Sequence, residues 1–164
     1  STIEGPFGSQ LVANGYFLNN ELTDFTFAPE KDGAPVANRV EAGKRPLSSM
    51  SPTIVYGPDG KAVFAVGAAG GKTIIMQVAK TLIAHLDWGL PVQEAVAAPN
   101  IYFSGDAILV EPDTPLAAMQ SQLAAFGRTV VAARMTSKAN AAEWTGTGWQ
   151  GAADPRSEGV ALGE

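Results

Sequence analysis

The stretch KRPLSSMSPTIVYGPDGKAVFAVGAAGGKT, residues 44–73, decides much of the fold of this chain. Its first part places Ser48 and Ser49 after a proline, in a turn where hydroxyl groups and backbone donors can face a ligand. Its last part places a glycine-rich loop, residues 67–73, at the start of a periodic helix. The free N–H groups and the dipole of such a helix start favour an anion. Together the two parts predict half of a pocket for a carboxylate and a developing oxyanion.

Strand and helix patterns alternate around this stretch. Apolar residues at three- to four-residue spacing predict an amphipathic helix over residues 71–88. The β-rich runs 53–56 and 61–66 flank Gly57-Pro58-Asp59-Gly60, which predicts a hairpin. Further predictions are a strand over 11–18, a loop over 26–43, a helix over 92–98, a hairpin over 101–110, a helix over 114–127, and strands over 129–133 and 141–149. The pattern indicates one mixed α/β layered domain, of α+β class with antiparallel hairpins, over residues 1–164.

Composition limits the function classes. The 164 residues are 46% hydrophobic and 16% charged, which is ordinary for one globular domain. A net charge of −5, with no basic cluster beyond Lys44-Arg45, argues against nucleic acid and anionic membranes as partners. The lack of cysteine excludes disulfides and thiolate metal sites, and fits a bacterial cytosolic or periplasmic protein equally well. With a single histidine as well, we expect no metal and no cofactor.

The glycine-rich loop resembles a nucleotide-binding P-loop only in part. A strand, a glycine loop, Gly71-Lys72-Thr73 and a helix follow one another as that motif requires. The motif needs four residues between its first glycine and the Gly-Lys pair, whereas three residues separate Gly67 from Gly71. A loop one residue short cannot wrap a phosphate with the same set of N–H groups, so we do not expect a nucleotide.

Four segments resemble, in order and spacing, the small, C-terminal subunit of the γ-glutamyltransferases (γ-glutamyltranspeptidases), which are N-terminal nucleophile hydrolases. They are FGSQLVANGYFLNNELTDF at 7–25, KRPLSSMSPT at 44–53, GAAGG at 67–71 and ADPR at 153–156. The resemblance implies part of a four-layer αββα sandwich shared with a large subunit of the same precursor, as a heterodimer. The parent enzyme would cleave γ-glutamyl amides such as glutathione through a γ-glutamyl-enzyme intermediate. It would pass the group to water, an amino acid or a peptide.

The resemblance also implies roles for individual residues. It assigns support of the nucleophile to Thr2, the oxyanion hole to Gly70 and Gly71, the substrate α-carboxylate to Ser48 and Ser49, and the α-amino group to Glu4, Glu21 and Asp24. Each also has a plain structural interpretation: turn serines, close strand–helix packing at the glycines, a turn acceptor at Asp24 and a solvated Glu21. Asp154-Pro155-Arg156 is interpreted as an ion-paired turn.

The chain departs from the family pattern in ways that affect function. The nucleophilic Thr is expected upstream of Ser1, so we interpret the chain as a fragment that lacks the first strand and the nucleophile. Alone it is expected to be inert and to self-associate through surface intended for the large subunit. Glu4 stands where many members have Asn, and Lys72 where many have a small Ser. The family suggests a periplasmic or secreted protein, and a cytoplasmic one is left open.

Two alternative functions remain. The loop over 26–43 is short and lacks the Tyr or Trp with which lidded members cover the γ-glutamyl pocket. An open pocket would admit larger acyl groups, as in the related cephalosporin and glutaryl acylases, or favour water over an acceptor peptide. The non-enzymatic alternative is an inert structural fragment.

Overall fold

The computed structural model describes residues 8–163, and the chain divides into two compact units, Ser1–Ser48 and Ser49–Glu164. The single domain expected over residues 1–164 stays a prediction.

The first unit consists of short hairpins around one turn of helix. Strands β1 (Val12–Ala13) and β2 (Tyr16–Phe17) pair antiparallel across Asn14 and Gly15, whose φ angles are +51° and +83°. The single strand predicted over residues 11–18 is therefore wrong, because an Asn-Gly pair with positive φ closes a two-residue hairpin. The 3₁₀ helix η1 (Glu21–Asp24) follows. The predicted loop over 26–43 contains a second hairpin, β3 (Glu30–Lys31) and β4 (Ala34–Pro35).

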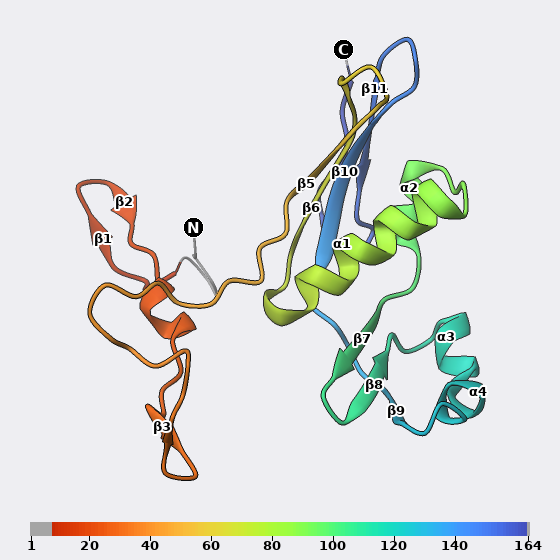
Figure 1. The fold of residues 1–164 in the computed structure, drawn as a ribbon. Coiled ribbons are helices and arrows are strands. Elements are labelled where there is room, and N and C mark those ends of the chain that lie inside the picture. The colour runs from red at the N-terminus through yellow and green to blue at the C-terminus, as the bar shows by residue number, and fades with distance from the viewer. Residues whose placement is uncertain (1–7, 164) are drawn as a thin grey trace. The chain divides into compact units, whose positions relative to one another are not determined.

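A four-stranded antiparallel sheet forms the centre of the second unit. Its strands are β5 (Thr53–Tyr56), β6 (Ala62–Ala69), β10 (Lys138–Trp144) and β11 (Trp149–Ala153), in the order β11-β10-β6-β5 (Figure 1). The predicted hairpin of β5 and β6 is confirmed. The single strand predicted over 141–149 is wrong, because Thr145 N–H and Oγ1 both donate to the carbonyl of Gly148 at 2.9 Å and reverse the chain.

Helices cover one face of this sheet and bury its apolar side chains. They are η2 (Gly71–Thr73), α1 (Ile74–Leu82), the π-helix η3 (Ile83–Asp87) and α2 (Val92–Ala97). The predicted helices over 71–88 and 92–98 are thus present, the first with a 3₁₀ start and a π-helical end. The core combines alternate strand residues with one stripe of each helix: Phe64, Val66, Ile74, Val78, Val92, Val96, Ala139, Ala141 and Ala152.

A smaller sheet and two short helices complete the second unit. Strands β7 (Ile101–Ser104) and β8 (Ala107–Val110) form the predicted hairpin, and β9 (Thr129–Ala132) runs parallel to β8. The helix predicted over 114–127 is interrupted at Met119, which separates α3 (Pro115–Ala118) from α4 (Gln120–Ala124). The predicted α+β class is confirmed. Among residues 8–163, no helix is both long enough and apolar enough to cross a bilayer.

Candidate functional site

The Gly70-Gly71 turn joins β6 to η2. The φ angles of the two glycines are +139° and +59°, a region that residues with a side chain avoid. Because Gly71 is the first residue of η2, its N–H has no carbonyl partner within the helix. The helix continues directly into α1, whose dipole adds positive potential at this end. The turn therefore presents backbone donors in a place that favours an anion.

Ser137 closes one side of this turn. A Cβ added to Gly70 would lie 2.4 Å from both the Cα and the Cβ of Ser137, so only glycine fits. Ser137 is 1% exposed, and its Oγ has no hydrogen-bond partner among the described residues. Close packing, the structural interpretation of the glycines given above, is therefore confirmed for Gly70, independently of any chemical role. At Gly71 an added Cβ meets no atom within 4 Å.

Asp154, at the C-terminal end of the chain, ties together the elements on both sides of the turn. Its buried carboxylate accepts hydrogen bonds through Oδ2 from Gln77 Nε2 at 2.9 Å and from the Ala139 N–H at 2.8 Å. Gln77 belongs to α1, which leaves the turn, and Ala139 pairs with Ala68 of β6, which enters it. One carboxylate thus sets the spacing between the strand and the helix that flank the glycines.

Arg156 neutralises this buried carboxylate and extends the network. Its Nη1 donates to Asp154 Oδ1 at 3.0 Å, which is the ion-paired turn expected from the sequence, and its Nη2 donates to Glu111 Oε2 at 2.7 Å. Burial is the largest single influence on Glu111 and works to raise its pKa. The hydrogen bonds from Arg156 and the Asn100 N–H, together with the positive charges of Arg156 and Lys80, outweigh burial and hold that pKa below its usual value. Nη2 also donates to the carbonyls of Ala97 and Ala98 at the end of α2. The elements that flank the turn are therefore held by a network of hydrogen bonds and ion pairs.

Lys80 lies next to this network, and its ammonium group gives the fold a pH dependence. Its Nζ donates to the carbonyls of Val96 at 3.0 Å and Ala98 at 2.8 Å. Burial, helped by the nearby positive charge of Arg156, lowers the pKa of Lys80 from 10.5 to about 8. Since a charged lysine is costly to bury, the folded state releases this proton more readily than the unfolded chain.

We expect the free energy of unfolding to rise with pH between about 8 and 10.5 through Lys80. In this window the unfolded state binds more protons than the folded state, so raising the pH stabilises the fold, by on the order of 3 kcal/mol in total. Urea unfolding at about pH 7.5 and about pH 10 measures the rise. It should disappear in Lys80→Met and persist in the control Lys61→Met, whose side chain is 83% exposed. An equal rise in Lys80→Met would contradict the assignment.

In the first unit, η1 carries both acidic residues expected at the substrate amine. Glu21 and Asp24 are three residues apart, which places them on one face because residues i and i+3 eclipse in a 3₁₀ helix. Glu21 is exposed and Asp24 is half-buried. Asn38, which the sequence patterns did not single out, holds this turn. Its Nδ2 donates to the Asp24 carbonyl at 2.7 Å, and its Oδ1 accepts from the Leu47 N–H at 2.9 Å, next to the serine pair.

The serine pair lies where the two units meet in the sequence. Ser48 is exposed and ends the first unit, and Ser49 is half-buried and begins the second. The hydroxyl of Ser51 donates to the Ser49 carbonyl at 3.1 Å, so the following serine supports the backbone of this turn. Thr2 and Glu4 lie outside the described residues. Within residues 8–163, no three His, Asp or Glu side chains gather as a metal site requires.

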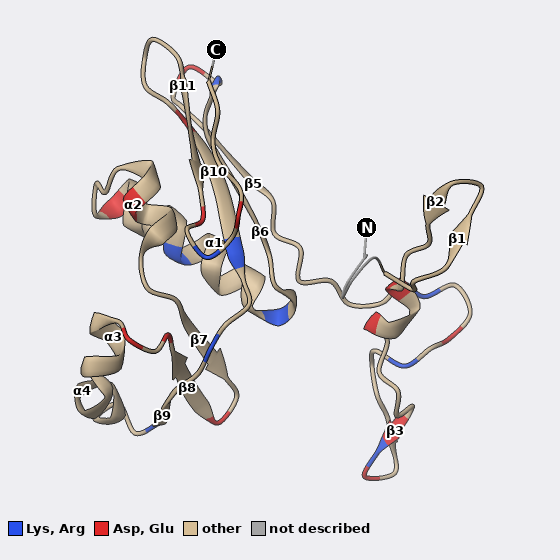
Figure 2. Ribbon diagram, turned by 180° about the vertical axis from the view of Figure 1, so that it is seen from behind, with Lys and Arg blue, Asp and Glu red and all other residues tan. Residues whose placement is uncertain are grey.

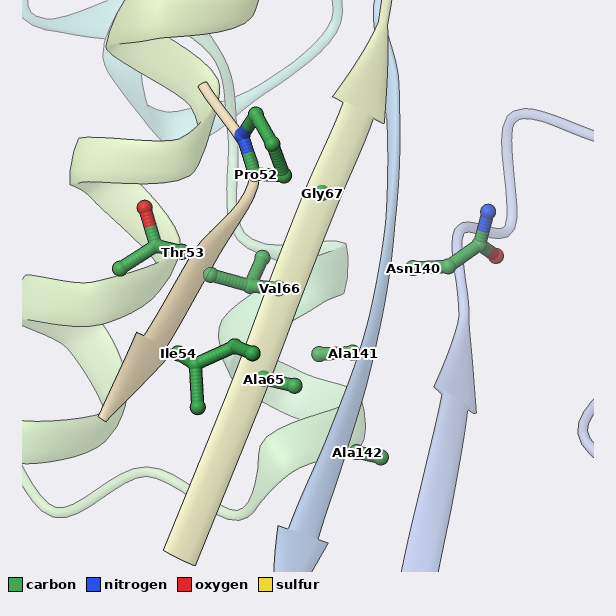
Figure 3. A pocket seen from close by; sticks show the side chains of 9 residues that line it. All are labelled: Pro52, Thr53, Ile54, Ala65, Val66, Gly67, Asn140, Ala141 and Ala142. Atoms are coloured by element: carbon green, nitrogen blue, oxygen red, sulfur yellow. The ribbon is translucent and has the colours of Figure 1, made fainter. Parts of the chain in front are cut away.

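The face of the four-stranded sheet opposite the helices is apolar, and several of its large side chains are exposed. Lys138 and Glu143 are the charged residues of these four strands, and charge is sparse along them (Figure 2). Across β5, β6 and β10 a hollow of ≈ 570 Å³ is lined by mostly small side chains (Figure 3). Ile54, which is exposed, lines the hollow, and further large exposed side chains lie on the same sheet: Tyr56, Trp144 and Trp149. Such an apolar sheet face is typical of a surface that another layer covers.

Comparison with known proteins gives one consistent result. The family model "Gamma-glutamyltranspeptidase" matches residues 1–164. A glutathione hydrolase proenzyme of Bacillus subtilis (strain 168) is 45% identical over 104 residues, which cover 62% of this chain and 17% of that protein. A glutathione hydrolase proenzyme of Pseudomonas aeruginosa is 35% identical over an alignment of 173 positions, covering 98% of this chain and 31% of that protein. The chain therefore spans less than a third of the length of these relatives.

Solved structures agree. The γ-glutamyltranspeptidase from Pseudomonas nitroreducens complexed with L-DON superposes with a TM-score of 0.81 at 31% identity, over 100% of this chain and 91% of that chain. A cephalosporin acylase from Bacillus halodurans shares the fold with a TM-score of 0.72 at 22% identity, over 89% of this chain and 27% of that chain. The family match over residues 1–164 establishes that the chain belongs to the γ-glutamyltranspeptidase family.

Proposed function

We propose that the protein carrying this chain is a γ-glutamyltransferase and glutathione hydrolase, and that the chain supplies the substrate-binding half of its acyl-transfer site. The observation that carries the proposal is the Gly70-Gly71 turn, which presents helix-start donors in a chain that matches this family over residues 1–164. Such donors stabilise the oxyanion that forms when a nucleophile attacks an amide. The nucleophile itself is a Thr upstream of Ser1, exposed when the precursor cleaves itself.

The remaining roles follow the chemistry of an amino acid's two charged groups. Ser48 and Ser49 bind the α-carboxylate through hydroxyl donors, and Glu21 and Asp24, with Glu4, bind the α-ammonium through carboxylates. Charge-assisted hydrogen bonds of both kinds are stronger than neutral ones and fix the substrate's orientation. Thr2 supports the nucleophile. Glutathione and other γ-glutamyl amides present this α-amino acid head to the site.

The proposed partner is a large subunit of the same precursor. It is supported by the apolar sheet face, whose Ile54, Tyr56 and Trp149 are each more than half exposed. A second sheet laid on this face would bury these side chains and complete a four-layer sandwich. Without that layer, the same face would drive self-association of the chain.

The test is turnover by the complete protein that carries this sequence. γ-Glutamyl-p-nitroanilide should be hydrolysed, and a dipeptide acceptor should increase the release of p-nitroaniline if transfer competes with water. N-terminal sequencing of the small subunit should place a Thr at the new terminus. A protein that cleaves itself but leaves the anilide intact would overturn the proposal.

We expect Ser48→Ala and Ser49→Ala to raise KM for the anilide by about 10–100-fold each, because hydrogen bonds to a charged group contribute about 1.5–3 kcal/mol. The value of kcat should change much less, since these contacts are made equally in the ground state and the transition state. Steady-state kinetics measures both constants. Ser121→Ala, the same change at an exposed position of α4, is the control. A KM unchanged in both serine variants would mean that these serines only form the turn.

The second candidate function is an acylase for β-lactam side chains. The observation that favours it is the loop over 26–43, which carries an exposed β3–β4 hairpin and no Tyr or Trp. Such a loop offers no Tyr or Trp to cover the acyl pocket. Comparing kcat/KM for a glutaryl-cephalosporin with that for glutathione separates the two functions, and we expect glutathione to be preferred.

A further inference from the structure

Thr73, the last residue of η2, is bonded to the glycine turn by its side chain. Its Oγ1 donates a hydrogen bond to the carbonyl oxygen of Gly70 at 2.9 Å, and the residue is half-buried. The resemblance to the family assigned no role to this position. The bond could simply be the local cap that Thr often makes near a helix start. The acceptor of this bond, however, belongs to the peptide group between the two glycines, so the bond also affects the direction of the Gly71 N–H.

The Gly70 carbonyl and the Gly71 N–H belong to the same peptide group. In a planar trans peptide these two bonds point in opposite directions, and the described residues contain no cis peptide. A hydroxyl that holds the carbonyl on one side therefore aims the N–H at the other. Two adjacent glycines have no side chains to restrict this plane, so its orientation depends on the contacts of its carbonyl and N–H. The carbonyl is held by the i→i+3 backbone bonding with which η2 begins and by the side-chain bond from Thr73.

We propose that Thr73 is a positioning residue: its hydroxyl holds the Gly70–Gly71 peptide so that the Gly71 N–H points at the developing oxyanion. This inference rests on the proposed function, because it assumes that the Gly71 N–H stabilises the transition state. Ser137 limits the turn from the Gly70 side through packing, and Thr73 limits it from the helix side through a side-chain hydrogen bond that adds to the backbone bonding of η2. Thr73 itself does not touch the reacting atoms.

The kinetic test compares Thr73→Val with Thr73→Ser in the complete protein. Valine keeps the shape and removes the hydroxyl, and serine keeps the hydroxyl. We expect kcat for γ-glutamyl-p-nitroanilide to fall about tenfold in the valine variant. This is less than the fall of about 10²–10³-fold in kcat that follows the complete loss of an oxyanion-hole donor, because the Gly71 N–H is still present. KM should stay within about twofold, because the hydrogen bond from the Gly71 N–H to the oxyanion forms only in the transition state. The serine variant should recover most of kcat.

The matched control is Thr81→Val. Thr81 makes an equivalent bond, from its Oγ1 to the carbonyl of Gln77 at 3.0 Å, further along α1 and away from the turn. Its loss should leave kcat unchanged. An equal fall of kcat in the Thr73 and Thr81 variants, or no recovery with serine, would overturn the proposal in favour of a merely structural bond.

A second measurement separates this inference from the proposed function. In the ¹⁵N-glycine-labelled complete protein, the N–H residual dipolar coupling of Gly71 reports the direction of that bond. We expect it to change in Thr73→Val beyond the changes at Gly67 and Gly89, and to be retained in Thr73→Ser. An unchanged coupling would overturn the positioning role. A changed coupling with an unchanged kcat would uphold the positioning role and refute the oxyanion role of Gly71.

Discussion

Gly70→Ala is expected to lower the free energy of unfolding by about 2–5 kcal/mol, through backbone strain and overpacking together. The φ of +139° is unfavourable for any residue with a Cβ, and that Cβ would lie 2.4 Å from the Cα of Ser137. Ser137 is buried directly before β10, so neither Gly70 nor Ser137 can move without disturbing its neighbours. In the complete protein, displacement of the Gly70 and Gly71 N–H groups should also reduce kcat by about 10²–10³-fold.

Two neighbouring glycines serve as graded controls. An added Cβ at Gly71 meets open space, so Gly71→Ala should lower the free energy of unfolding only through the strain of a left-handed backbone, by about 1–2 kcal/mol. Gly67→Ala also has open space and no positive φ, so its stability should match the parent within about 0.5 kcal/mol. Denaturant unfolding ranks the three variants. If Gly70→Ala were as stable as Gly67→Ala, the packing of Ser137 against the turn would be refuted. If the Gly70 variant does not fold, the ratio of kcat in Gly71→Ala to the parent still tests the site.

Asp154→Asn is expected to destabilise the fold by about 3–5 kcal/mol, as breaking a buried ion pair does. The carboxylate is 0% exposed, and each of its oxygens accepts from two donors. An amide NH₂ in either orientation would face two N–H donors and leave them unsatisfied. The guanidinium of Arg156 would lose one of its two carboxylate partners as well.

Denaturant unfolding of Asp154→Asn against Asp59→Asn measures this effect. Asp59 is an exposed carboxylate paired with Lys61 at 3.4 Å, and its loss should cost at most about 0.5–1 kcal/mol. A matching small loss at Asp154 would mean that the network is not needed for stability. Because Asp154 ties β10 to α1 beside the glycine turn, we also expect its substitution to lower kcat in the complete protein.

Much of the local structure could be predicted from the sequence. The helix over 71–88 and the hairpin of β5 and β6 follow from apolar spacing and from turn residues, which act between near neighbours. Two strand predictions were wrong, each because a short turn divides the predicted strand into a hairpin. Asn14-Gly15 split one predicted strand into two, and the turn at residues 145–148 split another, because a two- to four-residue reversal outweighs the β-propensity around it.

The sequence by itself determined the family, the helix that begins at the glycine turn and the identity of Gly70 and Gly71 as the candidate anion site. Only the tertiary structure decided what holds that turn in place. Ser137 occupies the space of a missing Cβ, and Asp154 reaches Gln77 across a separation of 77 residues. Contacts of this kind depend on which strands pair and which faces pack, so they leave no periodicity or spacing in the chain. The hydrogen bond of Thr73 spans only three residues, yet its consequence follows only from the orientation of one peptide plane.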